Sequence, residues 1–543
     1  MGASGALYMG AQFLYRTRDM GDTWERLSPD LTTNDPAKQQ QEKSGGLSVD
    51  NSSAENHCTI FTIGESPKDP DVIWVGTDDG NVQVTRDGGR SWANVTKALP
   101  GLPRSTWITS VAPSPHDPAT CFVTADGHWL GDFTPYVFVT RDGGRTWTSL
   151  ATPELKGYAH IVKQDPVNPD LIYLGTESGL FLSLDGGRQW APFKAGLPSV
   201  AVRDLAIQPG EGDLVIATHG RGVYVLDDLS PLRSLTRERL AAEAAFLDAR
   251  PGTLVIPRQE QRFAGSTDWR GDDLPEAAIL TYYPKKRHLI GELKVEVFDE
   301  TGKKLATLSG GRRRGINRVE WPMRLKGPKL PPAANLVPNQ YAAMGPRAAA
   351  GTYTAKLTKN QDTFTTTFRL VPDTRSTHTA EDRAAQVKLV NRLYALLGDL
   401  TYTVEGVQAL RDTARSRAKG LREDALATKL TGFADRLGAF RGTLVAAREG
   451  GRLTGEERLR EQLGDLYGKV NGYDGRPTGG QAALADVLEA ELHQGEAAFA
   501  AMLARDLPAL NAGLRAKMLP ELSRETREAW EKRGESPIGG GGS

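Results

Sequence analysis

Short apolar or alternating runs followed by turn residues fill the first 230 positions of the chain. Val82-Gln83-Val84 and Val137-Phe138-Val139 are two such runs, and each leads directly into a glycine-rich turn. This pattern predicts short strands joined by hairpins. The strands fall into groups of four at about 57–97, 105–150 and 158–193. A group at 6–28 lacks its first strand, and a group at 200–228 lacks its fourth.

One eight-residue pattern, Ser/Thr-x-Asp-x-Gly-x-x-Trp, recurs at the end of these runs. Its copies begin at Thr17, Thr85, Thr140 and Ser183, with uneven spacing, which indicates a repeated unit with loops of variable length. The carboxylate can accept hydrogen bonds from the amides of its own turn, glycine tolerates positive φ, and tryptophan packs as a large apolar plug. We therefore predict a structural role for the four aspartates, Asp19, Asp87, Asp142 and Asp185.

The octets resemble the Asp-box, or BNR repeat, of sialidases, sortilin-type receptors and xyloglucanases, which are β-propellers. The resemblance covers about 6–229, and the segments 71–80 and 218–222 also resemble large bacterial BNR-repeat glycosyl hydrolases. It implies an extracytoplasmic propeller whose blades are four-stranded antiparallel sheets, typically 4–8 to a ring. Three complete and two incomplete groups favour part of a larger propeller, completed by a missing segment or another chain, over a small closed ring.

The remaining sequence predicts two further domains after a helical linker at 231–243. Hairpins at 293–308 and 351–370 favour an immunoglobulin-like β-sandwich over 244–373. From 374 to 535 apolar residues recur every three or four positions, beginning after a capping box at Thr379, which predicts an antiparallel helical bundle with later helices at about 421–448, 454–471 and 480–507. Residues 536–543 form a glycine-rich tail of the kind used as a flexible linker. The predicted fold class is thus mainly β, then α.

The composition of the chain bears on which classes of partner it can bind. Lysine plus arginine equals aspartate plus glutamate at 67 each, so no global field attracts nucleic acid. No apolar run is long enough to span a membrane, and no motif for a metal or another cofactor is present in the sequence. The two cysteines, Cys58 and Cys121, lie in neighbouring repeats and could pair, but buried free thiols are expected.

Strand direction separates two faces of the predicted propeller. If the strands of a blade alternate in direction, the octets lie on one face, and the second-to-third turns and blade connections lie on the other. We predict a site for a polar ligand, such as a glycan or a protein segment, on this second face. Its predicted ligand-binding residues are Arg104, Trp107, His128, Trp129, Tyr158, His160, Arg203, His219 and Arg221, with Glu55 and His57 nearby.

Two functions remain open from these residues. The first is a module that binds a glycan or protein ligand. The second is a glycoside hydrolase, which needs two carboxylates across a cleft. The candidates for catalysis are Asp78 or Asp79 opposite Asp132 or Glu177. A sialidase is disfavoured because its Arg-Ile-Pro motif is absent from the sequence.

Overall fold

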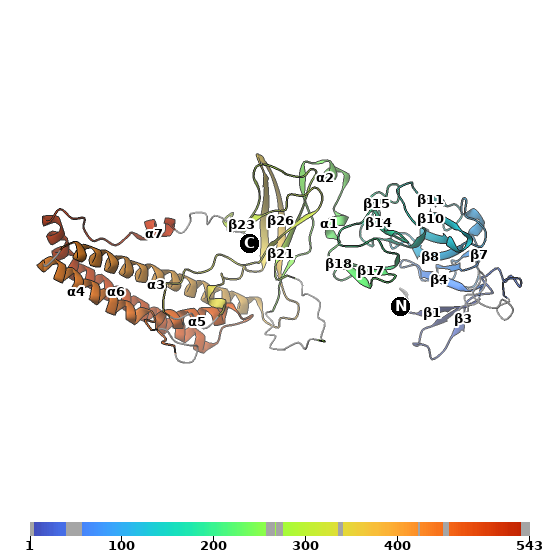
Figure 1. Ribbon diagram of the computed structural model, residues 1–543. Helices are drawn as coiled ribbons and strands as arrows, with labels where there is room; N and C mark the ends of the chain where they lie inside the picture. Colours follow the sequence, from blue (N-terminus) through green and yellow to red (C-terminus); the bar gives the residue numbers. More distant parts are fainter. Residues whose placement is uncertain are drawn as a thin grey trace. The chain divides into compact units, whose positions relative to one another are not determined.

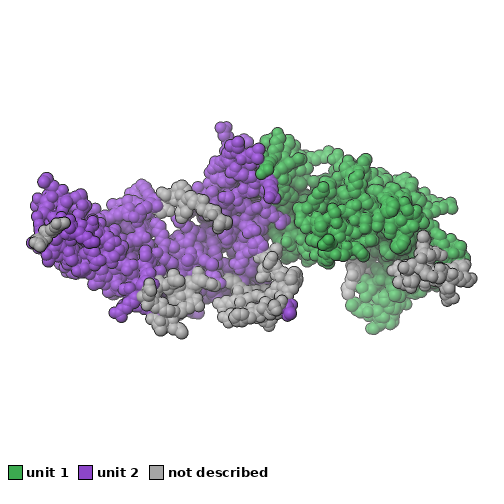
Figure 2. Space-filling view, viewed as in Figure 1, with its two compact units in different colours: residues 1–250, 281–287, 314–316 green, residues 251–280, 288–313, 317–543 purple. Residues whose placement is uncertain are grey.

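The structure, a computed structural model, describes residues 5–39, 57–256, 267, 275–334, 340–421, 424–448 and 455–533. The chain divides into two compact units, coloured separately in Figure 2. One comprises residues 1–250, 281–287 and 314–316, and the other comprises 251–280, 288–313 and 317–543. Among the described helices, none has an apolar stretch long enough to cross a bilayer. The predicted domain boundaries stay predictions.

The first unit is built mainly from five small antiparallel sheets in chain order (Figure 1). Each sheet keeps its strands in sequence order, as a succession of hairpins does. The sheets are β1 (Leu7–Gly10), β2 (Leu14–Thr17) and β3 (Glu25–Arg26); β4 (Ile60–Glu65), β5 (Ile73–Thr77), β6 (Val82–Thr85) and β7 (Ala93–Asn94); β8 (Trp107–Pro113), β9 (Cys121–Gly127), β10 (Asp132–Thr140) and β11 (Thr148–Ser149); β12 (Ala159–Gln164), β13 (Ile172–Thr176), β14 (Gly179–Ser183) and β15 (Ala191–Pro192); β16 (Val202–Gln208), β17 (Asp213–Thr218) and β18 (Val223–Leu226).

Burial on both faces explains why these sheets stack. Every residue of β9 is buried, but neighbouring residues face different sheets. Val123 packs in the core shared with β4–β7, whereas Phe122 packs in the core shared with β12–β15. Side chains alternate across a strand, so a sheet that is apolar on both faces needs a neighbour on each side. This stacking, with two three-stranded sheets at its ends, is consistent with the predicted partial propeller.

The four octets form the turns between the outer strands, and each aspartate fixes its own turn. Asp142 accepts hydrogen bonds from the backbone amide of Thr146 at 2.9 Å, from the Thr146 hydroxyl at 2.7 Å and from the Thr140 hydroxyl at 2.9 Å. These bonds, first those from Thr146, lower the pKa of Asp142 to about 2. The same contacts recur at Asp19 and Asp87. The carboxylates are therefore occupied inside their turns.

The octets also hold one sheet against the sheet before it. The Trp190 indole donates to the Leu150 carbonyl at 2.9 Å, and the Trp92 indole donates to the Leu27 carbonyl at 3.1 Å. Gly144, with φ of 92°, lies so close to the preceding sheet that an added Cβ would stand 3.2 Å from the Trp74 ring. Glycine is needed there for both the backbone conformation and the close approach.

The first unit also holds both cysteines and the start of the next region. Cys58 and Cys121 are buried free thiols, as expected. After the last sheet come α1 (Ser230–Arg233) and α2 (Arg237–Ala241), then β19 (Ala244–Leu247), which pairs with β21 (Ala278–Pro284).

The second unit begins with a five-stranded sheet. Its strand order is β20 (Gly252–Leu254), β26 (Asp362–Pro372), β25 (Gly351–Lys359), β22 (Leu293–Phe298) and β23 (Lys304–Ser309), and β24 (Asn317–Trp321) follows β23 in sequence. The first pair is parallel and the others are antiparallel. The strands match the predicted hairpins, and the immunoglobulin-like assignment stays a prediction.

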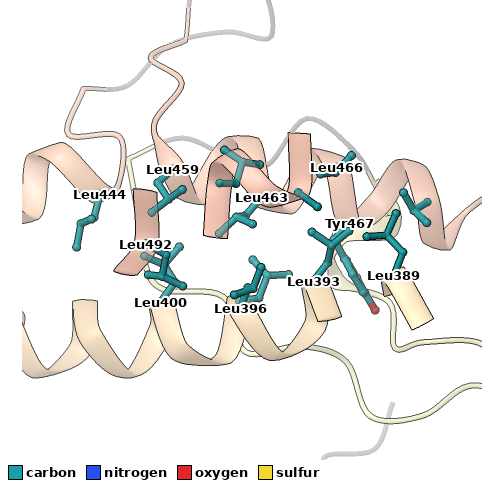
Figure 3. Packing of buried hydrophobic residues seen from close by; sticks show 14 of the residues in the cluster. Leu389, Leu393, Leu396, Leu400, Leu444, Leu459, Leu463, Leu466, Tyr467 and Leu492 are labelled. Carbon is teal, nitrogen blue, oxygen red and sulfur yellow. The ribbon is translucent and has the colours of Figure 1, made fainter. Parts of the chain in front are cut away.

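The C-terminal region is helical, as predicted. Its helices are α3 (Ala380–Gly420), α4 (Ala425–Leu444), α5 (Leu459–Asn471), α6 (Gly479–Ala516) and α7 (Arg527–Arg533). Leucines of α3, α5 and α6, such as Leu393, Leu463 and Leu492, pack in one core that also includes Tyr467 (Figure 3).

The end of α6 differs from the prediction. The expected end before Pro508 was wrong, because α6 continues to Ala516. Proline removes one helical hydrogen bond. Burial of Leu510 and Leu514 on the next turns compensates for that loss.

We predict that Trp190→Ala destabilises the first unit by about 3–5 kcal/mol, the usual cost of removing a large buried aromatic side chain. Trp190 is 4% exposed and fills the core shared by two sheets. Chemical denaturation followed by circular dichroism measures the effect. Trp24→Ala is the matched control, because it occupies the same octet position but is 42% exposed. Equal losses of unfolding free energy in the two variants would contradict the prediction that the buried octet tryptophan holds one sheet against the sheet before it.

Candidate ligand-binding face

The candidate face lies at the ends of the sheets opposite the octets. It is formed by second-to-third turns and by the connections that lead into β8, β12 and β16. The hairpin of β9 and β10 contributes most, because a short 3-10 helix at His128–Leu130 extends its tip. Gly131, with φ of 78°, closes that helix and lets the chain turn back into β10. The sequence therefore extends the tip of this hairpin by a short helical turn.

Aromatic side chains form a continuous row across this face. From Phe61 the ring centroids follow at 5.6 Å to Trp107, 6.0 Å to Trp129 and 4.8 Å to His128. His128 then stacks on Tyr158 at 4.5 Å with nearly parallel planes. The row continues to His160 at 5.0 Å, and Phe133 joins it at 6.1 Å from Tyr158. Tertiary structure thus gathers rings from three neighbouring sheets.

The exposure of the row changes along its length. Trp129 is 53% exposed and Phe133 is 65% exposed, while Tyr158 and His160 are buried. Large exposed aromatic side chains that cluster on one face are typical of binding surfaces. The row therefore has an exposed apolar part at Trp129 and Phe133 and a buried, more polar part at Tyr158 and His160.

Asp126 positions His128 in this row. Its Oδ1 accepts the His128 backbone amide at 2.9 Å and lies 2.7 Å from the ring Nδ1. An ionised carboxylate can only accept, so Nδ1 carries a proton and donates. Asp126 is almost fully buried in β9, which fixes the direction of the imidazole. The Asp126–His128 pair therefore holds the stack on Tyr158.

A second histidine lies between two opposite charges. His160 Nε2 donates to Glu177 Oε2 at 3.0 Å, and Arg203 Nη1 lies 3.4 Å from His160 Nδ1. Arg203 also reaches Glu177 directly at 3.6 Å. The strand of His160 is held by the preceding sheet, because the Thr124 hydroxyl donates to the His160 carbonyl at 3.2 Å. The three side chains close a triangle with a neutral imidazole at its buried corner.

The pKa values agree with this arrangement. Burial lowers the pKa of His160 and outweighs the hydrogen bond that His160 donates to Glu177, which acts in the opposite direction. For Glu177, burial acts upward, but the His160 hydrogen bond and the Arg203 charge together lower its pKa. Burial, together with the Glu177 charge, raises the pKa of Tyr158. Near neutral pH the site thus presents an ionised Glu177 and a neutral His160.

A small cavity opens beside the exposed end of the row. Its volume is about 230 Å³, and its lining includes Lys38, His57, Trp107, Asp126 and Trp129. Lys38 is held there by a hydrogen bond to Ser105 at 2.9 Å. Pockets for drug-sized ligands are about 300–1,000 Å³. This cavity therefore suits one ring of a longer ligand.

The other predicted carboxylates have structural partners. Asp79 is buried and accepts from the Thr33 amide and hydroxyl, and Asp78 accepts from the Thr59 amide at 2.8 Å. Asp132 accepts from the Tyr136 hydroxyl at 2.7 Å, and that bond is the first cause of its lowered pKa. Of the four predicted catalytic residues, Glu177 is thus the one that joins the cluster.

The remaining predicted residues are more scattered. Arg104, His219 and Arg221 lie on the exposed surface. Glu55 lies outside the residues that the structure describes. His57 lines the small cavity and lies 4.0 Å from Asp78. No group of three or more His, Cys, Asp or Glu side chains in the described ranges could hold a metal ion.

Sequence reasoning missed Asp126, Lys38, Phe61 and Phe133. An acidic residue two positions before His128 was a usable signal, since such a side chain often bonds to the backbone amide two residues on. Phe61 gave no comparable signal, because an aromatic residue inside a strand usually belongs to the core. Its exposure is a result of the way the sheets stack.

Comparisons with known proteins find similarities that cover part of the chain. No family model matches the chain. A xyloglucanase specific for the reducing end of oligoxyloglucan, from Emericella nidulans, is 24% identical over 261 residues, covering 42% of this chain and 30% of that protein. A probable enzyme of the same kind from Neosartorya fischeri is 25% identical over 256 residues, with the same coverage. The chain therefore spans about a third of the length of these relatives.

Among solved structures, a GH74 enzyme of Niastella koreensis is similar with 12% identity and a TM-score of 0.31. The match covers 68% of this chain and 53% of that one. The two curated relatives are named as glycoside-cleaving enzymes, so of the two functions left open by the sequence, the comparisons favour the glycoside hydrolase over the binding module.

We predict that Glu177→Gln lowers the pKa of His160 further. Glu177 raises that pKa through its hydrogen bond and its charge, so neutralising it leaves burial and Arg203 opposed by the charge of Asp126. Titration of the histidine ring signals by NMR, with His160 assigned by its loss in His160→Gln, measures the change. Asp170→Asn, at an exposed turn on the octet side, is the control and leaves the pKa unchanged. A rise in the pKa of His160 in the Glu177→Gln variant would contradict the proposed interaction of His160 with Glu177 and Arg203.

Proposed function

We propose that the first unit is the substrate-engaging part of a glycoside-hydrolase-like propeller of Asp-box type, and that its aromatic face binds a neutral polysaccharide such as xyloglucan. The observation that carries the proposal is the row of rings from Phe61 to Tyr158, which ends at the ionised Glu177. The xyloglucanase names of the curated relatives support the substrate class. A protein acting on such a polymer works outside the cytoplasm, which agrees with the predicted location.

The chemistry of the face fits a sugar chain. Pyranose rings have apolar faces that pack on indole and phenyl rings and hydroxyl groups that bond to charged side chains. Trp129 and Phe133 offer the ring faces, while Lys38, Glu177 and Arg203 offer polar groups beside them. Apolar walls with a few oriented polar groups are what a specific ligand site needs.

Glu177 supplies one of the two functions that hydrolysis requires. With its lowered pKa it can act as a base or a nucleophile, and His160 and Arg203 hold its orientation. A general acid needs a raised pKa. Asp132 does not provide one, because its pKa is also lowered. We propose that the second carboxylate comes from a part of the propeller that completes the ring, either elsewhere in a longer chain or on another chain.

A binding module without turnover is the second candidate. The observation that favours it is the engagement of Asp78, Asp79 and Asp132 in hydrogen bonds within the fold. On this view Glu177 orients a sugar hydroxyl and does no chemistry. The two candidates share the same ligand face and differ in the role of Glu177.

We predict that Trp129→Ala weakens binding of xyloglucan oligosaccharides about tenfold, which corresponds to about 1.4 kcal/mol. The indole is 53% exposed, and its loss removes the stacking face next to the small cavity. Isothermal titration calorimetry measures the dissociation constant. Trp24→Ala removes an exposed indole from an octet and leaves the affinity unchanged. Equal affinity of the unaltered protein, Trp129→Ala and Trp24→Ala would contradict the proposed binding face.

Glu177→Gln separates the two candidates. If the chain, together with whatever completes its ring, hydrolyses xyloglucan, we expect this variant to lose at least 100-fold in kcat while it still binds oligosaccharide. Reducing-sugar release measures turnover. Asp170→Asn retains full activity. Binding without turnover in the completed assembly of the unaltered protein would support the binding module.

A further inference from the structure

A cavity lies in the helical region of the second unit, far along the chain from the aromatic row. Its volume is about 670 Å³, within the range of about 300–1,000 Å³ typical of ligand pockets. Helix α3 forms one wall through residues 402–411, and Arg441 near the end of α4 forms another. The C-terminal segment 523–533 closes the third side.

The C-terminal segment is fixed in this position by specific contacts. The Tyr402 hydroxyl donates to the Glu525 carbonyl at 2.8 Å, and the Trp530 indole donates to Glu405 at 2.8 Å. Arg527 forms an ion pair with Asp399 at 2.6 Å. Trp530 itself is buried. The wall is therefore part of the folded unit.

Two arginines in the lining have no carboxylate partner among the described residues. Arg441 donates to the Pro332 carbonyl, and Arg524 lies over the Tyr402 ring, with a long contact of 3.4 Å to the Thr403 hydroxyl. The Nε atoms of both side chains are buried and lack a hydrogen-bond partner in the described structure. A buried donor without a partner destabilises the fold, and it does so more strongly when it is charged. The fold therefore leaves the hydrogen-bonding capacity of both guanidinium groups incompletely used.

The surrounding charges do not cancel these two cations. Glu405 pairs with Arg533 at 3.1 Å, and Glu525 lies 3.5 Å from the same guanidinium. Arg411 pairs with its neighbour Asp412 at 3.2 Å. The carboxylates of the lining are thus already engaged with other arginines.

The pKa values show the same imbalance. Burial lowers the pKa of Arg441, and the nearby charges of Arg411 and Arg460 lower it further against the opposing effects of Asp412 and Glu461. Burial also lowers the pKa of Arg524, with Arg527 acting in the same direction and Tyr402 and Glu496 opposing. Both cations are less favourable in the folded protein than in water, and an anion would relieve this.

We propose that this cavity is a binding site for a small organic anion carrying a carboxylate or phosphate group, held by Arg441 and Arg524. A guanidinium offers paired donors that match two oxygens of such a group. The apolar side chains of Val404 and Ala409 in the lining leave room for an organic remainder. The site is independent of the proposed polysaccharide face, so either can fail without the other.

Calorimetric titration of the whole chain with phenyl phosphate and with benzoate tests the site. We expect saturable binding of at least one of them with one site per chain, weakening as salt rises. Comparison of the two titrations shows whether the site prefers a phosphate or a carboxylate group. Phenol, which lacks the anionic group, should not bind. Failure of both anions to bind would overturn the proposal.

Variants at Arg441 place the binding in this cavity. Arg441→Gln should weaken binding at least tenfold, and Arg441→Lys, which keeps the charge, should recover part of the loss. Arg415→Gln, which removes an exposed arginine paired with Asp435 across the same two helices, should bind like the unaltered protein.

The melting temperature without ligand separates a ligand-binding role from a structural one. If Arg441 serves the ligand, removing a cation that has no carboxylate partner and lies near other cations leaves the melting temperature of Arg441→Gln unchanged or raises it. A marked fall, or binding retained within twofold, would show that the guanidinium serves the fold alone.

Discussion

Burial on both faces of each sheet is the constraint on which the first unit depends. A strand such as β9 has apolar side chains on both of its faces, so its sheet is stable only between two neighbours. The octets reinforce this stacking, since each buried tryptophan reaches back to the sheet before it. Because all sheets stack with the same strand order, their second-to-third turns gather at one end. The candidate ligand face is a consequence of core packing.

The same packing sets the chemistry of that face. His160 belongs to the buried end of a strand, and its burial keeps the ring neutral beside an ionised Glu177. Asp126, equally buried, has His128 as its partner and so fixes the ring that stacks on Tyr158. The polar groups that orient the site are therefore anchored in the core, while the aromatic groups that would meet a sugar project from it.

The second unit uses polar groups in a contrasting way. Many of its described arginines have carboxylate partners, for example Arg392 with Asp486 at 2.7 Å. Arg441 and Arg524 depart from this pattern, because neither has a carboxylate partner among the described residues, and both line a cavity while their buried Nε atoms lack a hydrogen-bond partner. In a bundle whose leucine core already provides the packing, such groups add little to stability. This contrast is the physical basis for assigning them to a ligand.

The sequence by itself determined the local elements. Alternating runs and turn residues predicted most strands of the first 230 residues, and apolar periodicity predicted the main helices, because both signals depend on near neighbours in the chain. It also separated the two ends of the sheets. Only the tertiary structure decided which side chains meet: it turned Asp78 and Asp79 inward, left Phe61 exposed, and brought His160, Glu177 and Arg203 together from three strands or turns. Lateral distances between sheets depend on packing of residues far apart in sequence, and no local pattern encodes them.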